Sequence, residues 1–122
     1  MKYRAPERRR FIRIEVPLEV QLTSDIINES SYSKNISPIG MCCEVTVNVP
    51  VGYVLNTFIK LPGSEELISA QAKVVWVKRI SLEDDSNFDI GLVLNEIDEK
   101  QKKVLLKYLC DILYDSAYGT GL

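Results

Sequence analysis

The residues most capable of chemistry in this sequence are arginines near its start. Arg9 and Arg13 stand four positions apart, and Arg8 and Arg10 flank the first of them. A guanidinium group makes two parallel hydrogen bonds to a phosphate or to the O6/N7 edge of guanine, which lysine meets only as a point charge. The segment therefore favours recognition of phosphates and guanine edges.

A second group of polar residues, Asn35, Ser37 and Gly40, forms an N-x-S-x-x-G stretch. A strand that leaves Arg13 and turns near residues 24–31 returns by Asn35, so a hairpin brings the amide and the hydroxyl towards the arginines. Gly40 permits a close backbone approach. Such an arrangement can hold a phosphorylated purine. The alternative is an ordinary turn built from residues that turns prefer.

Most catalytic chemistry is excluded by composition. The chain contains no histidine, which removes His-based acid–base and nucleophile systems and most zinc sites. Its glycines are scattered and form no phosphate-cradling loop. Cys42, Cys43 and Cys110 fit neither a disulfide framework nor a metal-ligand spacing, and all three are interpreted as buried small residues. We expect no catalytic residue, no metal and no cofactor.

The charge is distributed unevenly along the chain. Residues 1–13 hold six Lys or Arg and Glu7 alone, a charge of +5, whereas the other 109 residues hold nine Lys or Arg and sixteen Asp or Glu, a charge of −7. A basic arm on an acidic body is a local anion trap, and the body would repel a long polyanion. We therefore expect no nucleic-acid partner, although a binder that uses the arm alone is an alternative.

Alternating hydrophobicity predicts six short strands followed by one helix in a single domain of 122 residues. Asp98 and Gln101 resemble a capping box at the start of the helix. The pattern indicates an antiparallel barrel or sandwich closed by that helix. The expected boundaries are a flexible basic arm over 1–13, a barrel over 14–96, a helix over 98–113 and a frayed tail over 116–122, with strands at 12–23, 31–36, 41–47, 54–61, 67–77 and 88–94.

Alternation in the fifth of these strands places Trp76 on the same face as Val74, which predicts a core position. A position near the bound ligand is the alternative. No apolar run is long enough for a membrane span or a signal core, so we expect a cytoplasmic protein without membrane insertion.

The stretch 7–13 (ERRRFIR), followed by Asn35-x-Ser37-x-x-Gly40, resembles the PilZ domain, a bacterial receptor module for cyclic di-GMP. Segments 72–77 (AKVVWV) and 88–94 (FDIGLVL) are similar to the mid-domain and closing strands of that family. The resemblance covers nearly the whole chain and implies a six-stranded antiparallel β-barrel of the split-barrel type. An N-terminal arginine segment would wrap over the ligand.

The resemblance also implies roles for particular residues. Arg9 and Arg13 would grip guanine edges and phosphates, and Arg8 would favour two stacked ligand molecules. Asn35 and Ser37 would contact a guanine base and order the loop that Gly40 closes, while Arg10 would raise the local potential.

The function expected from these observations is a non-enzymatic cyclic di-GMP receptor or adaptor in second-messenger signalling, whose ligand orders the arginine arm for an unidentified downstream protein. The alternative is a PilZ-like protein–protein adaptor that binds no nucleotide, for example one associated with pili or motility. A monomer and a homodimer are both compatible with the sequence.

Overall fold

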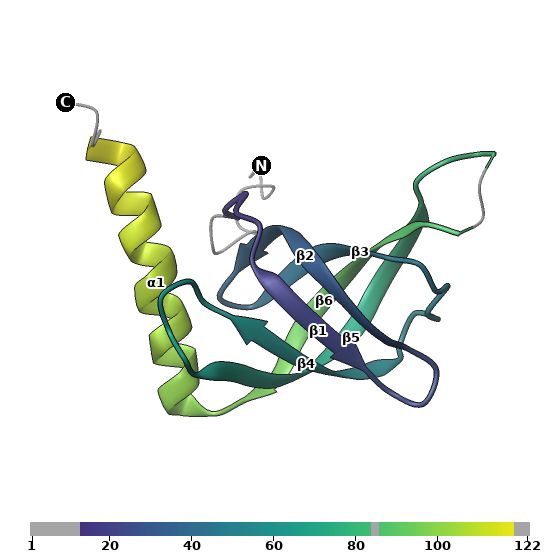
Figure 1. Cartoon of the computed structure of the whole chain (residues 1–122), viewed down its shortest axis with the longest axis horizontal. Helices are drawn as coiled ribbons and strands as arrows, with labels where there is room; N and C mark the ends of the chain where they lie inside the picture. Colours follow the sequence, from purple (N-terminus) through teal and green to yellow (C-terminus); the bar gives the residue numbers. More distant parts are fainter. Residues whose placement is uncertain (1–12, 84–85, 119–122) are drawn as a thin grey trace, which may run out of the picture.

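The computed structural model describes residues 13–83 and 86–118 and contains six strands and one helix (Figure 1). The strands close into one antiparallel barrel in the order β1-β2-β3-β6-β5-β4. Alternation had left a barrel and a sandwich open, and the barrel is the fold that the family resemblance implied. The elements are β1 (Glu19–Thr23), β2 (Asn28–Ser37), β3 (Gly40–Val45), β4 (Val54–Lys60), β5 (Leu67–Arg79), β6 (Phe88–Ile97) and α1 (Glu99–Tyr118).

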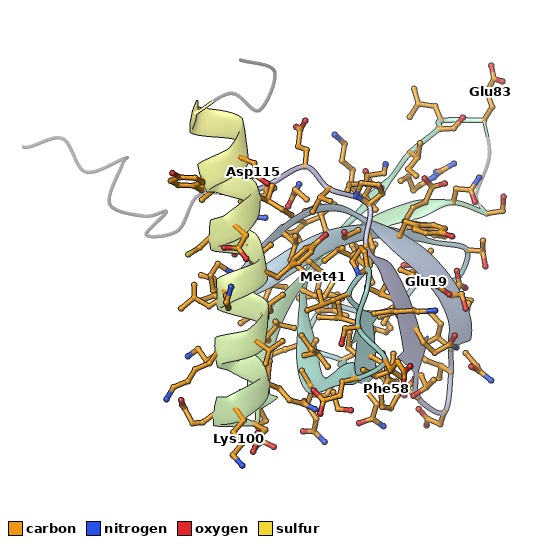
Figure 2. The ribbon with its side chains drawn as sticks, turned by 60° about the vertical axis from the view of Figure 1, so that its left-hand side comes forward. Glu19, Met41, Phe58, Glu83, Lys100 and Asp115 are labelled. Carbon is orange, nitrogen blue, oxygen red and sulfur yellow. The ribbon has the colours of Figure 1, made fainter. Side chains whose placement is uncertain are left out.

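The barrel interior is filled by the apolar residues of each alternating strand. Figure 2 shows Met41 among the interior side chains, whereas Glu19 lies on the outside. Closure of the sheet removes its free edges and gives the chain a single continuous core. The fully buried side chains include Leu18, Leu22, Ile36, Met41, Leu55, Ile59, Ile68 and Ile90.

The first strand is shorter than the alternation over 12–23 predicted, since β1 covers only the last five residues of that segment. Pro17 has no N–H to offer a neighbouring strand, and its ring fixes φ. Buried Ser33 replaces the missing ladder contacts. Its Oγ accepts a hydrogen bond from Leu18 N at 2.9 Å and donates one to Val16 O at 2.6 Å.

The prediction that Trp76 belongs to the core was wrong. The pairing of β5 with β6 shifts register between Val74 and Trp76, so that one extra residue enters β5 at this point. Such a bulge reverses the inside–outside alternation beyond it. Val74 is fully buried, whereas Trp76 lies on the outer surface with 39% of its area exposed.

The helix α1 stands along one side of the barrel (Figure 1) and packs through Leu105 and Leu109, which are both buried. Asp98 caps it, because its Oδ2 accepts hydrogen bonds from the backbone N–H groups of Lys100 and Gln101. The Gln101 side chain does not complete a capping box. Instead it binds the start of β5, accepting from Ser69 N at 2.9 Å and donating to the Leu67 carbonyl at 3.1 Å.

The helix runs past the expected end at Leu113 and includes residues 116–118, which we had assigned to a frayed tail. No glycine or proline stands between Glu99 and Gly119, so nothing in the local sequence ends the helix earlier. Cys110 is exposed, contrary to expectation, because it falls outside the stripe that packs on the barrel. Among the described residues, no helix combines the length and apolarity that a membrane span requires.

Candidate functional site

Arg13 and Asn35 meet at the surface, as the hairpin argument predicted. Arg13 Nη1 donates a hydrogen bond of 2.9 Å to Asn35 Oδ1, although 22 positions separate the two residues. The contact is supported from below by Ile14 and Ile36, whose backbones exchange hydrogen bonds of 2.8 and 2.9 Å. The N-terminal segment therefore enters the fold directly beside β2.

Ser37 and Gly40 order the turn between β2 and β3. Ser37 is buried, and its Oγ accepts a hydrogen bond of 3.3 Å from Ile39 N and lies 3.5 Å from the Gly40 carbonyl. A Cβ atom on Gly40 would stand 2.3 Å from the backbone oxygen of Leu92. Gly40 is therefore required for the close approach of β3 to β6.

The outer face of the barrel next to Asn35 has a floor of small residues. Strands β2, β3, β6 and β5 lie in that order, and their register aligns Asn35, Cys42, Gly91 and Trp76 in one row. The Trp76 indole lies over Gly91, because a Cβ there would be 2.2 Å from Trp76 Nε1. Arg13, which contacts Asn35, and the Trp76 indole therefore lie at opposite ends of this row of paired residues. The floor between them is formed by Cys42 and Gly91.

Electrostatic effects on Cys42 show which charges lie close to this floor. Burial raises the pKa of the Cys42 thiol, the Asp89 carboxylate raises it further, and Lys34 and Arg13 lower it. The thiol therefore remains neutral at physiological pH and contributes a small, uncharged surface. Charges of both signs surround a floor that is itself uncharged.

The other arginines of the predicted site, Arg8, Arg9 and Arg10, lie outside the described residues. Of the residues predicted for the site, the structure describes Arg13, Asn35, Ser37 and Gly40.

Sequence reasoning left Cys42, Gly91 and Trp76 out of the candidate site. Alternation assigned Trp76 to the interior, and neither Cys42 nor Gly91 belongs to a recognisable pattern. One signal was available, since a glycine in a strand interior often marks a close approach by another group. Over residues 13–83 and 86–118, no group of three or more His, Cys, Asp or Glu side chains is arranged to hold a metal ion.

Comparison with known structures supports the architecture. MotI/DgrA, the inhibitor of motility of Bacillus subtilis, is similar with a TM-score of 0.74 and 22% identity, over 88% of this chain and 52% of that chain. The MrkH–c-di-GMP complex of K. pneumonia gives a TM-score of 0.72 and 18% identity, over 90% of this chain and 54% of that chain. The chain thus spans about half the length of these two proteins.

A shorter structure matches over nearly its whole length. The PilZ domain of YcgR from Escherichia coli, with c-di-GMP, is similar with a TM-score of 0.64 and 16% identity, over 90% of this chain and 94% of that chain. At these identities the likeness shows the fold. No curated protein sequence matches the chain.

The family itself is shown by sequence. The model of the PilZ domain matches residues 7–110, which include both the arginine segment and the N-x-S-x-x-G stretch. This match and the closed six-stranded barrel agree with the resemblance seen in the sequence. The chain belongs to the PilZ domain family.

Proposed function

We propose that this chain is a receptor for cyclic di-GMP, which binds on the outer face of β2, β3 and β6 and orders the arginine arm. The observation that carries the proposal is the hydrogen bond from Arg13 to Asn35 at the edge of the floor formed by Cys42 and Gly91. It joins the two motifs on one surface. Membership of the PilZ family and the c-di-GMP complexes of MrkH and YcgR give further support.

The chemistry of the ligand suits this surface. Cyclic di-GMP carries two phosphodiester charges and two guanines, and an arginine fork can bind either group. The partly exposed indole of Trp76 offers a stacking platform at the far end of the floor, and base–aromatic stacking is worth about 1–3 kcal/mol. Gly91 leaves room for the indole to lie close against β6.

The arm supplies the proposed signal. Arg13 is fixed by its contact with Asn35, so Arg8 and Arg9 would close over a ligand bound beside it, and Arg8 would favour a second, stacked ligand molecule. Arg10 would add positive potential. Ordering a segment on ligand binding creates a new surface, which a downstream protein would recognise.

Calorimetric titration with cyclic di-GMP tests the proposal through Arg13→Ala and Asn35→Ala. Since a bidentate arginine–guanine contact is worth about 1–3 kcal/mol, Arg13→Ala should weaken binding by roughly one to two decades. The melting temperature should barely change, because the Arg13 side chain is exposed. Lys60→Ala, which removes one exposed cation from β4, is the matched control and should bind as the wild type does.

If both Arg13→Ala and Asn35→Ala bound cyclic di-GMP as tightly as the wild type, the proposed location of the site would be wrong. Absence of binding by the wild-type chain, with no rise in melting temperature at high ligand concentration, would favour the nucleotide-independent adaptor instead. One observation supports that second function: Leu82, in the β5–β6 hairpin, is 93% exposed. Figure 2 shows Glu83, the next residue in the sequence, on the side of the molecule away from α1.

A further inference from the structure

Strand β2 contains a bulge immediately before Asn35. Ser33 pairs with Cys43 and Asn35 pairs with Cys42, so Lys34 is an extra residue on β2. Ser33 is buried, while Lys34 and Asn35 both face outwards. A β-bulge can aim two successive side chains at the same face of a sheet. Lys34 therefore shares the outer face with the Arg13–Asn35 contact.

The Lys34 ammonium lies between two carboxylates in the ligand-free chain. Its Nζ is 2.7 Å from Asp89 Oδ1 and 3.7 Å from Glu44 Oε1. The side chain of Lys34 is 43% exposed and that of Asp89 is 21% exposed. The hydrogen bond to Asp89 is the main reason why the pKa of Lys34 is raised. Lys34 is thus held mainly by Asp89, the less exposed of the two acids.

This ion pair borders the floor of the candidate site. Glu44 pairs with Asp89 across β3 and β6, one outward position along from the row that contains Cys42 and Gly91. Lys34 stands next to Asn35, which pairs with Cys42, so the ion pair lies beside the floor. An anion that rests on the floor therefore meets the ammonium and the carboxylate together.

We propose that Lys34 is a further phosphate-binding residue of this site and that Asp89, by holding its ammonium, lowers the affinity for ligand. The proposal rests on the proposed function. On ligand binding, the Lys34 ammonium moves from the carboxylate to a phosphate oxygen. Asp89 then acts as an internal competitor that sets the ligand concentration at which the receptor responds.

The magnitudes permit such an exchange. The Lys34 side chain is 43% exposed, so solvent screens much of its attraction to Asp89. A phosphodiester offers the same ammonium a charge equal to that of the carboxylate. Lysine is suited to the exchange because its charge sits on a flexible four-carbon stem. Asp89 has a short side chain and is the second residue of β6, paired through its backbone with both neighbouring strands, so it stays in place when the ammonium leaves.

The other interpretation is structural: Lys34 would only neutralise Asp89 and fasten β2 to β6. Titration of four proteins with cyclic di-GMP separates the two, namely the wild type, Asp89→Asn, Lys34→Met and the double variant. Asp89→Asn should bind about two- to fivefold more tightly than the wild type, because it frees the ammonium and removes a repulsive charge. The decisive comparison is between Asp89→Asn and the double variant, because neither contains the Asp89 carboxylate and they differ only at Lys34. The double variant should bind about two- to fivefold more weakly than Asp89→Asn.

Asp111→Asn is the matched control, since it breaks the exposed Lys107–Asp111 ion pair of 3.1 Å on α1 and makes the same charge change away from the site. It should bind as the wild type does. Equal affinities of Asp89→Asn and the double variant, with both folded by melting temperature, would overturn the role of Lys34. An affinity of Asp89→Asn no higher than that of the wild type would overturn the role of Asp89. Absence of binding by the wild type would overturn the proposed function itself.

Discussion

The indole of Trp76 lies across Gly91, so close that a Cβ atom on Gly91 would stand 2.2 Å from Trp76 Nε1. The two residues face each other across β5 and β6, where the bulge after Val74 turns the indole outwards. The position of the only tryptophan in the chain therefore depends on a glycine in the neighbouring strand. Its fluorescence reports directly on the candidate site.

Gly91→Ala should displace the indole from the floor. The clash is with a side chain that can move, so the barrel should fold with a small loss of stability, while the tryptophan emission shifts. Binding of cyclic di-GMP should weaken by roughly one decade, since a stacked base contributes about 1–3 kcal/mol. Emission spectra and a calorimetric titration measure both effects. Shifted emission with wild-type affinity in this variant would show that the indole does not form part of the site.

Gly40→Ala should behave differently, because its added Cβ would meet backbone. The neighbouring atom is the carbonyl oxygen of Leu92, at 2.3 Å, and β3 must separate from β6 to relieve the contact. Overpacking of this kind costs about 1–3 kcal/mol or more. Urea unfolding should show the loss without ligand, and a free energy of unfolding equal to that of Gly91→Ala would contradict this distinction between the two glycines.

Ser33→Ala should destabilise the barrel by about 1–3 kcal/mol, because it removes a buried hydroxyl that serves two backbone groups around Pro17.

Thr57→Val should have the opposite effect on stability. Thr57 is fully buried in β4, and among the described residues its Oγ1 has no hydrogen-bond partner. Replacing it by an apolar group of the same shape should stabilise the fold by about 1 kcal/mol.

Urea unfolding of the two variants beside the wild type measures both changes. Each strand remains in register in both variants, so the slope of the free energy against urea should stay constant. A loss of stability in Thr57→Val would show that the Thr57 hydroxyl is hydrogen-bonded in solution. A neutral Ser33→Ala would show that the segment around Pro17 is held by packing alone.

Stability should fall in alkaline solution because of Cys43. Burial raises the pKa of its thiol from 9.0 to about 12. Between these two values the unfolded thiol has lost its proton and the folded one retains it, so the unfolded state binds fewer protons. The free energy of unfolding therefore decreases as the pH rises from about 9 towards 12.

Urea unfolding under reducing conditions at pH 8, 9 and 10 measures this slope. Cys43→Ala should be less stable throughout, since it leaves a cavity, but its stability should depend less on pH than that of the wild type. Cys110→Ala is the control, because Cys110 is exposed and should leave the slope unchanged. A Cys43→Ala slope identical to that of the wild type would contradict the assignment. The raised pKa values of Lys34 and Tyr53 act in the same direction and are common to all three proteins.

Local patterns predicted the parts of this structure that local rules control. Alternation identified six strands, and hairpin geometry brought Asn35 to Arg13. Trp76 could not be placed in the same way, because a bulge adds one residue without changing the apolar character of the strand. The hydrogen bonds by which Ser33 holds the segment around Pro17 could not be predicted either, because they join residues that are distant in sequence.

The residues of the candidate site also fall into two groups, those that a local motif identified and those that depend on the strand register. Motif residues such as Arg13 and Ser37 were visible because their types are rare in combination. Lys34 was not, since a lone lysine in a strand carries no signal until the register is known, and Gly91 indicated a close approach without showing which group lies over it. The register is set by pairing over the whole barrel, which no local window contains.

The central claim is that cyclic di-GMP binds the outer face of β2, β3 and β6, and amide chemical-shift mapping of the ¹⁵N-labelled chain tests it most directly. Titration with ligand should move the signals of Asn35, Cys42 and Gly91 and the indole N–H of Trp76 most strongly. Signals of β1 and β4 around Phe58, on another part of the barrel, should stay in place. Shifts centred on Phe58, or no shifts at millimolar ligand, would contradict the account.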